Sequence, residues 1–336
     1  MEHKAKRWIN RIIGVIFLGA AVATVITHIP KKEEKAKYIF LFIGDGMGSP
    51  IVSLTESYMS YKAGKLGGER LSFSNFPYFG AVTNHSADRA ITCSAAAGTA
   101  IATGHKTNNG MLGRNPEGEP LRSFAYDLKD EGYKIGILTN TPVNHATPAC
   151  FYSSPEKRHH HYEIIQALAS SEFDFIAGTG FKGYFGNTET DTDSETLLKD
   201  AGYKIYWGTE EYAQRESESD KTILCQAHNK GKEAKEYFVD GFERANEFKL
   251  EDFMRACLDS FGDKEPFFIM CEGGTIDWIA HTNKTIPTVK LVQEMDDAVK
   301  VAYEFYLKHP DETLIVVTAD HDTGGVAMGY GNQWMG

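Results

Sequence analysis

Residues 38–48 read Tyr-Ile-Phe-Leu-Phe-Ile-Gly-Asp-Gly-Met-Gly, and this stretch decides the fold class. Its first six residues are apolar or aromatic and are closed by glycines, a pattern that predicts a strand buried on both faces of a mostly parallel sheet. Asp45 follows the carboxyl end of that strand. Because ligands bind at this edge of open α/β sheets, Asp45 is a candidate site residue. A tight Gly-Asp-Gly turn with a local hydrogen bond would have the same sequence.

The rest of the chain alternates between strand and helix patterns. Further strands are predicted over residues 79–83, 134–140, 173–177, 266–271 and 313–319. Helices are predicted over residues 49–62, from Ser94, and over residues 121–131, 156–170 and 285–308. This alternation predicts an α/β fold with a mainly parallel central sheet flanked by helices on both faces. Residues 178–265 are less regular and are expected to form short βα units with surface excursions.

The N-terminal segment has the pattern of an export signal. Four basic side chains within residues 1–11 precede an uncharged apolar run over residues 12–26, and Ala21-Val22-Ala23 is a small-residue cleavage motif. We interpret residues 1–23 as a signal peptide and residues 24–37 as a polar linker. The protein is therefore expected to be exported, to the periplasm or outside the cell.

The alternative for this segment is a retained membrane anchor that reaches about residue 30. The apolar run has 15 residues, whereas roughly 20 are needed to span a bilayer, which favours the cleaved signal. A membrane is expected as a partner only if the segment is retained.

Composition and charge exclude some classes of function. The chain has 336 residues, of which 42% are hydrophobic and 24% charged, as in a globular protein with a large core. Removal of residues 1–23 takes away four positive charges and one negative charge, so the formal net charge falls from −11 to −14. Nucleic acid is therefore not expected as a partner, because its binding requires basic patches.

The five cysteines contain no Cys-x-x-Cys pair, which argues against a zinc-ribbon site. Cys93, Cys150 and Cys271 lie in apolar or small-residue runs and are expected in the core. A disulfide between Cys225 and Cys257 is conceivable in an exported protein, although no other feature of the sequence supports it.

A second candidate stretch is residues 92–100, Thr-Cys-Ser-Ala-Ala-Ala-Gly-Thr-Ala. The small residues after Ser94 allow a helix to pack tightly. A serine at a helix N-terminus faces unpaired N–H groups and the positive end of the dipole, which suits a nucleophile that attacks an anion. Taken alone, a plain serine N-cap is the more common explanation.

A third stretch, Asn144-His145-Ala146-Thr147-Pro148, follows the strand predicted to end near residue 140. The hydroxyl of Thr147 can ligate a hard cation such as magnesium. Arg158, eleven residues later, can hold a phosphate by two parallel hydrogen bonds. Each residue taken singly is more often a surface residue, and residues 159–161, three histidines, are expected to be a solvated cluster.

Two later motifs bring more ligands to the same edge of the sheet. Asp277 and His281 are spaced i, i+4 on a helix, which suits zinc, although an exposed Asp–His pair would have the same spacing. Glu272 follows one buried strand, and Asp320 and His321 follow another. Three strands thus deliver acidic residues or histidines to one rim, and this convergence is much rarer by chance than any one motif.

Together these motifs resemble those of the alkaline phosphatase family. They read Ile-Gly-Asp-Gly-Met-Gly, Ser-Ala-Ala-Ala-Gly-Thr-Ala, His-Ala-Thr-Pro-Ala, Glu-Gly-Gly-Thr-Ile-Asp-Trp-Ile-Ala-His and Thr-Ala-Asp-His-Asp-Thr-Gly-Gly. The resemblance runs from Tyr38 to about Tyr330 and is weakest over residues 178–265. It implies a catalytic domain over residues 38–336 that hydrolyses small-molecule phosphate monoesters through a phosphoserine, with two Zn²⁺ and one Mg²⁺. It also implies a homodimer.

The resemblance further implies a role for each matched residue. Ser94 matches the nucleophile and Arg158 the phosphate clamp. The implied metal ligands are Asp45, Thr147 and Glu272 for magnesium, Asp45, Ser94, Asp320 and His321 for one zinc, and Asp277 and His281 for the second zinc. His145 matches a variable position beside the magnesium site, where it would tune that metal. Two metals about 4 Å apart can hold the attacking and leaving oxygens of a phosphoryl transfer in line.

The sequence departs from the family pattern in two places. The second zinc normally has another histidine, in a downstream His-Thr segment, and none of His105, His228 and His309 has the matching context. We therefore expect either a truncated or fragmentary sequence or a damaged second zinc site. Cys93 stands where the family often has an aspartate that helps to position the arginine, so Arg158 is expected to be held more loosely.

The same motifs also distinguish this chain from other classes of protein. Sulfatases need a modified Cys or Ser followed by Pro and Arg, which residues 93–97 lack. Phosphodiesterases and phosphomutases share the metal rim, but the context of Ser94 and the spacing from Glu272 to His281 favour a monoesterase. The remaining alternative is a protein that binds metal or phosphate with little turnover, which the unassigned zinc ligand leaves open.

Overall fold

A computed structural model describes residues 35–188, 190–215, 221–234 and 248–327. The chain divides into two units, residues 1–36 and 37–336, and the elements below all belong to the second. The predicted signal peptide and most of the predicted linker lie outside the described residues. Within the described part of the chain, no helix is both long enough and apolar enough to cross a membrane.

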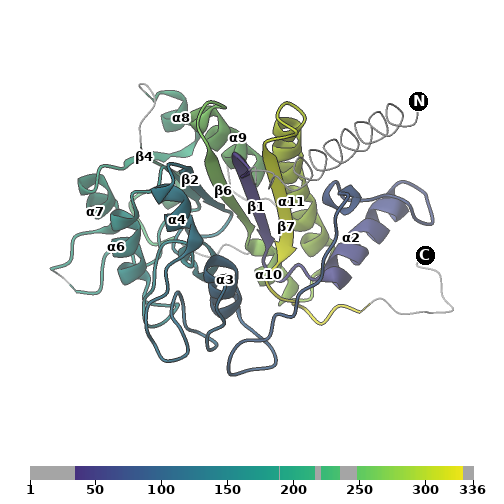
Figure 1. The fold of residues 1–336 in the computed structure, drawn as a ribbon, viewed down its shortest axis with the longest axis horizontal. Coiled ribbons are helices and arrows are strands. Elements are labelled where there is room, and N and C mark those ends of the chain that lie inside the picture. Colours follow the sequence, from purple (N-terminus) through teal and green to yellow (C-terminus); the bar gives the residue numbers. More distant parts are fainter. Residues whose placement is uncertain (1–34, 189, 216–220, 235–247, 328–336) are drawn as a thin grey trace, which may run out of the picture. The chain divides into compact units, whose positions relative to one another are not determined.

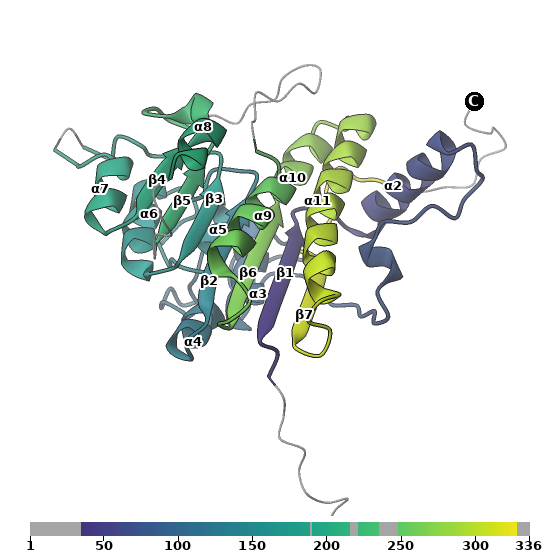
Figure 2. The same cartoon turned by 90° about the horizontal axis from the view of Figure 1, so that it is seen from above.

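Seven strands among the described residues form one parallel sheet in the order β4-β5-β3-β2-β6-β1-β7 (Figures 1 and 2). They are β1 (Tyr38–Gly44), β2 (Lys134–Thr139), β3 (Phe175–Gly178), β4 (Lys204–Trp207), β5 (Thr222–Cys225), β6 (Phe267–Gly273) and β7 (Thr313–Ala319). The predicted α/β fold with a parallel sheet is confirmed.

Helices cover both faces of the sheet (Figures 1 and 2). One face packs against α9 (Leu250–Phe261) and α11 (Thr285–Tyr306), and α2 (Ser49–Lys62) packs in turn against α11. The other packs against α3 (Ser94–Thr103), α4 (Phe124–Asp130), α6 (His161–Ser171) and α7 (Ser194–Asp200). The remaining short helices are α5 (Ala146–Ala149), α8 (Gly208–Ala213), α10 (Thr275–Ala280), η1 (Phe73–Asn75) and η2 (Ala227–Asn229).

The register of the central strands sets up the ligand edge. β1 pairs with β7 so that Gly44 lies opposite Ala319, and Asp45 and Asp320 therefore emerge side by side one residue later. β1 pairs with β6 so that Ile43 lies opposite Glu272. Parallel pairing brings all these carboxyl ends to one rim, which is where α/β proteins bind ligands.

Alternate residues of β1 supply two separate cores. Phe40 and Phe42 are buried in the cluster with α9 and α11, whereas Leu41 and Ile43 are buried in the cluster with α3 and α6. Burial on both faces explains the unbroken apolar run, since a strand in the middle of a covered sheet has no polar face. Truncation of either phenylalanine to alanine would cost about 3–5 kcal/mol of stability.

The edge strand β7 departs from its predicted full burial. Leu314 is 45% exposed and Val316 is 39% exposed, whereas every residue of β6 is buried. The cause is position, because β7 is the last strand of the sheet and the described helices cover only one of its faces.

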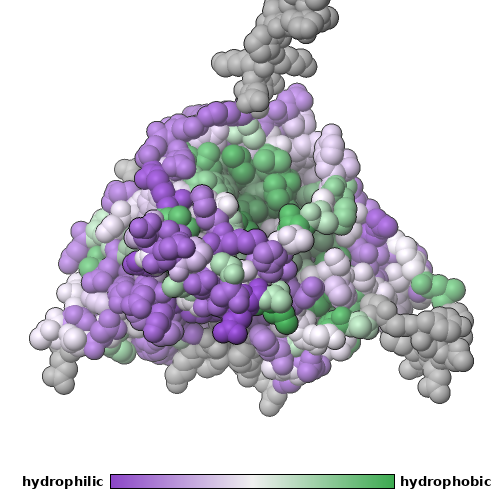
Figure 3. Space-filling view, turned by 60° about the horizontal axis from the view of Figure 1, so that its bottom comes forward, coloured by the Kyte–Doolittle hydropathy of each residue, from purple (hydrophilic) through white to green (hydrophobic). Residues whose placement is uncertain are grey.

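Hydrophobic side chains also gather in a hollow on the face of the molecule seen in Figure 3.

Other local predictions were also wrong. Residues 79–83 form no strand, and Phe79 is 95% exposed. The helix predicted over residues 121–131 begins at Phe124, because the hydroxyl of Ser123 caps it by accepting from the N–H of Ala125.

The remaining corrections concern a helix start and the cysteines. The helix predicted from residue 156 begins at His161, so Arg158 lies in the loop before it. Cys225 and Cys257 are both free thiols buried in the core, which contradicts a disulfide between them.

Candidate active site

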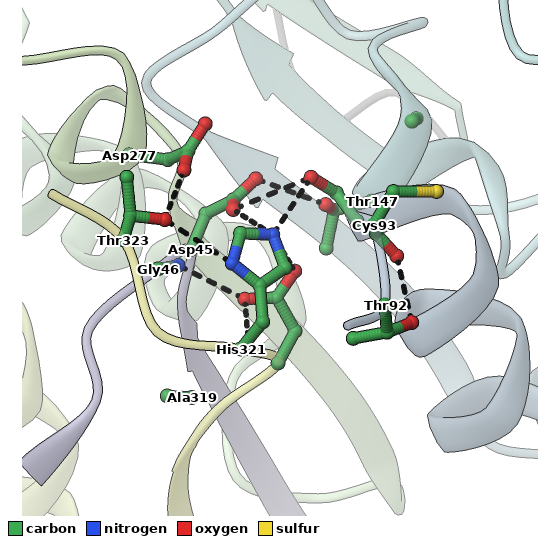
Figure 4. A network of polar contacts seen from close by, with 12 residues as sticks. Asp45, Gly46, Thr92, Cys93, Thr147, Asp277, Ala319, His321 and Thr323 are labelled. Atoms are coloured by element: carbon green, nitrogen blue, oxygen red, sulfur yellow. Dashed lines mark hydrogen bonds and ion pairs between the residues drawn. The ribbon is translucent and has the colours of Figure 1, made fainter. Parts of the chain in front are cut away.

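Asp45 is the centre of a group of polar side chains at the carboxyl ends of the strands (Figure 4). Its side chain is fully buried. Nε2 of His321 lies 3.2 Å from Oδ1 of Asp45 and 3.4 Å from Oδ2 of Asp320. The N–H of Gly46 donates to Oδ1 of Asp320 at 3.0 Å, which ties the β1 turn to the β7 turn.

Ser94 is the first residue of α3, and its side chain points to the same group. Its Oγ lies 3.4 Å from Oδ1 of Asp45 and 3.2 Å from Nε2 of His321. Cys93, in an extended backbone conformation, occupies the N-cap position and makes no side-chain cap. The plain N-cap explanation of Ser94 is therefore wrong, and its hydroxyl faces a carboxylate and an imidazole instead.

A second set of side chains surrounds the other oxygen of Asp45. Thr147, in α5, donates to Oδ2 of Asp45 at 3.3 Å. Glu272 accepts hydrogen bonds from the hydroxyls of Thr139 and Thr141, while its Oε1 is buried without a hydrogen-bond partner. Asp45, His145 and Glu272 each offer one ligand atom. These three atoms lie within 4.8 Å of one another, which is close enough for them to bind one metal ion.

The electrostatics of these carboxyl groups favour a cation between them. Burial, and then the charge of Asp320, raise the pKa of Asp45 well above its ordinary value. Burial raises the pKa of Glu272 to about 7 and also raises that of Asp320. Neighbouring buried carboxylates cannot all ionise unless positive charge is placed among them.

Asp277 and His281 lie together at the outer side of the group. Nε2 of His281 is 3.4 Å from Oδ1 of Asp277. Asp277 is also close to the central residues, since it forms with Asp45 and His321 a second group whose ligand atoms lie within 4.8 Å. The side chain of His281 is 69% exposed, in contrast to the 10% of Asp277.

These residues open onto a cavity of about 780 Å³, which Ser94, Arg158, Asp277, His281 and His321 help to line. Among the described lining residues the histidines are His281 and His321, so no third histidine is assigned to a zinc at Asp277 and His281.

Arg158 is held by its backbone and by one histidine. Its N–H donates to the carbonyl of Gly110 at 3.1 Å, and the thiol of Cys93 accepts from the N–H of Gly110 at 3.2 Å. Nη2 of Arg158 lies 3.4 Å from Nε2 of His145. Burial, and next the charge of Arg158, hold the pKa of His145 well below its ordinary range. Cys93 therefore contacts Arg158 indirectly: its thiol bonds the N–H of Gly110, and the carbonyl of Gly110 bonds the N–H of Arg158.

Sequence reasoning missed several hydroxyl groups. Thr139 and Thr141 hold Glu272, and Thr323 contacts Asp277 and His321. Thr323 stands inside a quoted motif, but threonine is too common after a strand to signal a site. In the cluster at residues 159–161, His159 is exposed, as expected, whereas Nδ1 of His161 is buried without a hydrogen-bond partner.

The sequence model of the family described as alkaline phosphatase matches residues 36–336. This chain belongs to the alkaline phosphatase family. It is 31% identical to Alkaline phosphatase 4 of Bacillus subtilis over 95% of this chain and 68% of that protein. With Alkaline phosphatase 3 of the same organism it shares 29% identity over 88% of this chain and 63% of the relative. The chain thus spans roughly two thirds of the length of these relatives.

Solved structures agree with the family assignment. The alkaline phosphatase from the Antarctic bacterium TAB5 superposes with a TM-score of 0.74 and 27% identity, over 87% of this chain and 81% of that chain. A variant of the TAB5 enzyme in which aspartate replaces a histidine, with magnesium bound in its M3 site, gives a TM-score of 0.72 at 26% identity, covering 87% of this chain and 80% of that chain. Members of this family thus bind metal, and the present fold is the alkaline phosphatase fold.

Proposed function

We propose that this protein hydrolyses phosphate monoesters to alcohol and inorganic phosphate through a phosphoserine at Ser94. The observation that carries the proposal is the position of the Ser94 hydroxyl, 3.4 Å from Asp45 and 3.2 Å from His321, in a cavity also lined by Arg158. Family membership supports phosphomonoester hydrolysis in general, and the phosphoserine and the metal set are our proposals.

We propose that these donor atoms hold three metal ions. We propose Asp45, Thr147 and Glu272 as magnesium ligands, with His145 beside them. One zinc would be held by Asp45, Ser94, Asp320 and His321, and the other by Asp277 and His281. The buried Oε1 of Glu272 and Oδ2 of Asp320 have no hydrogen-bond partner, as expected of atoms that coordinate a cation. When bound, the metals would neutralise the phosphoryl group and hold the attacking and leaving oxygens in line.

The chain's own residues supply the nucleophile and the clamp. Oγ of Ser94 gives up its proton to solvent and forms a bond to phosphorus, while the bond from phosphorus to the ester oxygen breaks and that oxygen takes a proton from solvent to leave as the alcohol. Water then attacks the phosphoserine, which releases inorganic phosphate and restores the hydroxyl. Arg158 would bind the equatorial oxygens by two parallel hydrogen bonds, and the free N–H groups at the start of α3 would favour the same negative charge.

A second candidate function is a family member that binds metal or phosphate with little turnover. The observation that favours it is the outer pair, Asp277 and His281, because His321 is the one further histidine among the described residues that line the cavity. A two-ligand zinc site is expected to bind weakly, which would slow departure of the leaving group.

Zinc content and turnover separate the two functions. The chain is loaded with zinc and magnesium, and hydrolysis of a chromogenic phosphate monoester is measured for the natural sequence and for Ser94→Ala. We expect near two zinc ions per chain and a turnover that Ser94→Ala removes, together with a mass increase of one phosphoryl group on trapping at acid pH. Ser170→Ala, an exposed serine on α6 that bonds only the carbonyl of Gln166, is the matched control. Turnover unchanged in Ser94→Ala would exclude its role as nucleophile.

Export and dimer formation also stay proposals. Both can be checked on the full chain, by N-terminal sequencing of the protein from its host and by its mass in solution.

A further inference from the structure

The cavity in front of Ser94 is much larger than the phosphoryl group that the proposed reaction transfers. Its volume is about 780 Å³, which lies within the range of about 300–1,000 Å³ for pockets that enclose whole small-molecule ligands. A phosphoryl group is comparable in size to a few water molecules, each of which occupies about 30 Å³ in the liquid. Most of the cavity is therefore available to the alcohol part of a substrate.

Four of the residues that line this cavity form what we call the apolar lining, namely Pro50, Ala90, Ile91 and Val326. None of the four is buried, and the side chain of Ile91 is 81% exposed. A large apolar side chain that is exposed inside a cavity is typical of a surface that a ligand covers. The apolar lining belongs to the same cavity as Ser94, so a ligand held at the serine can also contact it.

Hydrogen bonds to Asn109 hold the backbone around Ile91 in place. The amide of Asn109 donates to the carbonyl of Ile91 at 2.9 Å and accepts from the N–H of Cys93 at 3.1 Å. Ile91 is three residues before Ser94, and three residues of extended chain span at most about 11 Å. A six-carbon chain has as many bonds as about two residues of backbone and extends about 7 Å, so an alcohol of this length can reach the isoleucine side chain.

The polar groups of the cavity favour an alcohol without charge. Among the described lining residues, Arg158 is the one arginine or lysine, and we have assigned it to the phosphoryl oxygens. The carboxylate of Asp322 lines the same cavity and would repel a second anionic group. The side chains of Asn84 and Thr92 each donate to a backbone carbonyl, at 3.1 and 3.3 Å, and so have fewer donors to offer to the hydroxyls of a polyol.

We propose that the apolar lining binds the alcohol part of the substrate, so that the enzyme prefers phosphate monoesters of uncharged alcohols with an apolar chain. The inference rests on the proposed function, because the phosphoryl end of the ligand is placed at Ser94 and Arg158. Ile91 is then a residue that determines specificity and takes no part in the transfer itself. A methylene group that fills an apolar pocket changes selectivity about 10- to 200-fold.

The first test uses alkyl phosphonates, whose carbon–phosphorus bond the proposed reaction does not break, so that it measures binding without turnover. The affinities of hexylphosphonate and methylphosphonate are measured by titration calorimetry with the full chain loaded with zinc and magnesium. We expect hexylphosphonate to bind at least about tenfold more tightly than methylphosphonate. Equal affinity for the two, or no measurable binding of either, would overturn the proposal.

Two variants then assign the preference to Ile91. Ile91→Ser keeps the backbone carbonyl that Asn109 holds, and we expect the ratio of the two affinities to fall about tenfold. Its affinity for methylphosphonate should stay within about threefold of that of the natural protein. Leu66→Ser is the matched control, because Leu66 is 93% exposed and lies outside the cavity lining. An unchanged ratio in Ile91→Ser, or the same fall in Leu66→Ser, would overturn the proposal.

A third ligand tests the preference for an uncharged alcohol. In 6-phosphonohexanoate a carboxylate replaces the terminal methyl group of hexylphosphonate. We expect it to bind at least about tenfold more weakly than hexylphosphonate, because a charge placed against apolar side chains without a partner loses its hydration. Equal or tighter binding of the carboxylate would contradict this preference.

Hydrolysis of the chromogenic ester tests the proposed function separately. If the natural protein prefers hexylphosphonate but hydrolyses no ester, the proposed function fails and the binding preference stands. If it hydrolyses the ester but binds both alkyl phosphonates equally, only the present inference fails.

Discussion

The two groups of ligand atoms that share Asp45 differ in how far they are from water. The inner group, Asp45, His145 and Glu272, is entirely buried. The outer group, Asp45, Asp277 and His321, opens to the cavity, and the adjoining His281 is mostly exposed. Buried carboxylates are costly without a cation, whereas exposed ligands keep their hydration. We infer that the inner site governs stability of the metal-free chain and that the outer site governs exchange with solution.

The largest expected effect comes from Asp45, the one residue in both groups. Asp45→Asn removes the shared negative charge, so we expect loss of zinc and magnesium together and a fall in turnover of at least about 10²-fold, as for loss of one preorganised electrostatic group. Metal analysis and steady-state kinetics measure both. Retention of either metal at full stoichiometry would show that the two groups do not depend on a common ligand.

Glu272 distinguishes the inner group by its effect on folding. Glu272→Gln keeps an acceptor for the hydroxyls of Thr139 and Thr141 but removes a buried charge. We expect the metal-free variant to be more stable than the natural protein at pH 8 by about 1–3 kcal/mol, and magnesium binding to be lost. Urea unfolding of chelator-treated protein measures the difference. A less stable variant would mean that the charge of Glu272 is already compensated without metal.

The pH dependence of metal removal sharpens the same contrast. Folding raises the pKa of Glu272 from an ordinary value near 4.5 to about 7. The folded state then binds more protons than the unfolded state between these values, so the free energy of unfolding of metal-free protein falls as pH rises through this window. A shift of this size is worth about 3 kcal/mol. Chelation should therefore lower the melting temperature more at pH 8 than at pH 5. An equal change at both pH values would contradict a raised pKa of Glu272 in the metal-free protein.

The smallest effect on folding is expected at His281. Its side chain is mostly exposed, so His281→Ala should change the free energy of unfolding by no more than about 0.5 kcal/mol. Zinc content should fall while magnesium content is unchanged, because His281 belongs to the outer side alone. Elemental analysis tests this, and loss of magnesium in the variant would show that the two groups are coupled more tightly than their burial indicates.

Much of the fold was readable because its strands carry strong local signals. The unbroken apolar runs that became β1 and β6, each ended by a glycine and an acidic residue, predicted both the parallel sheet and its ligand edge. Residues 79–83 have a similar short run, yet they form no strand, since an apolar pattern alone does not supply a pairing partner. The disulfide between Cys225 and Cys257 failed for a related reason, because spacing along the chain says nothing of where two core thiols point.

For the candidate site, residue types and their order along the chain were enough to single out Asp45, Ser94, Glu272, Asp277 and Asp320 as candidates, because each lies at or just beyond the end of a strand or in the first turn of a helix. Their arrangement was not available from the sequence. Strand register put Asp45 beside Asp320, and burial raised the pKa of Asp45. The contact of Thr323 with Asp277 spans 46 residues of sequence and depends on the missing side chain of Gly46. The sequence alone determines which chemical groups are present and in what order. Their distances, burial and pKa shifts arise only when distant segments pack together.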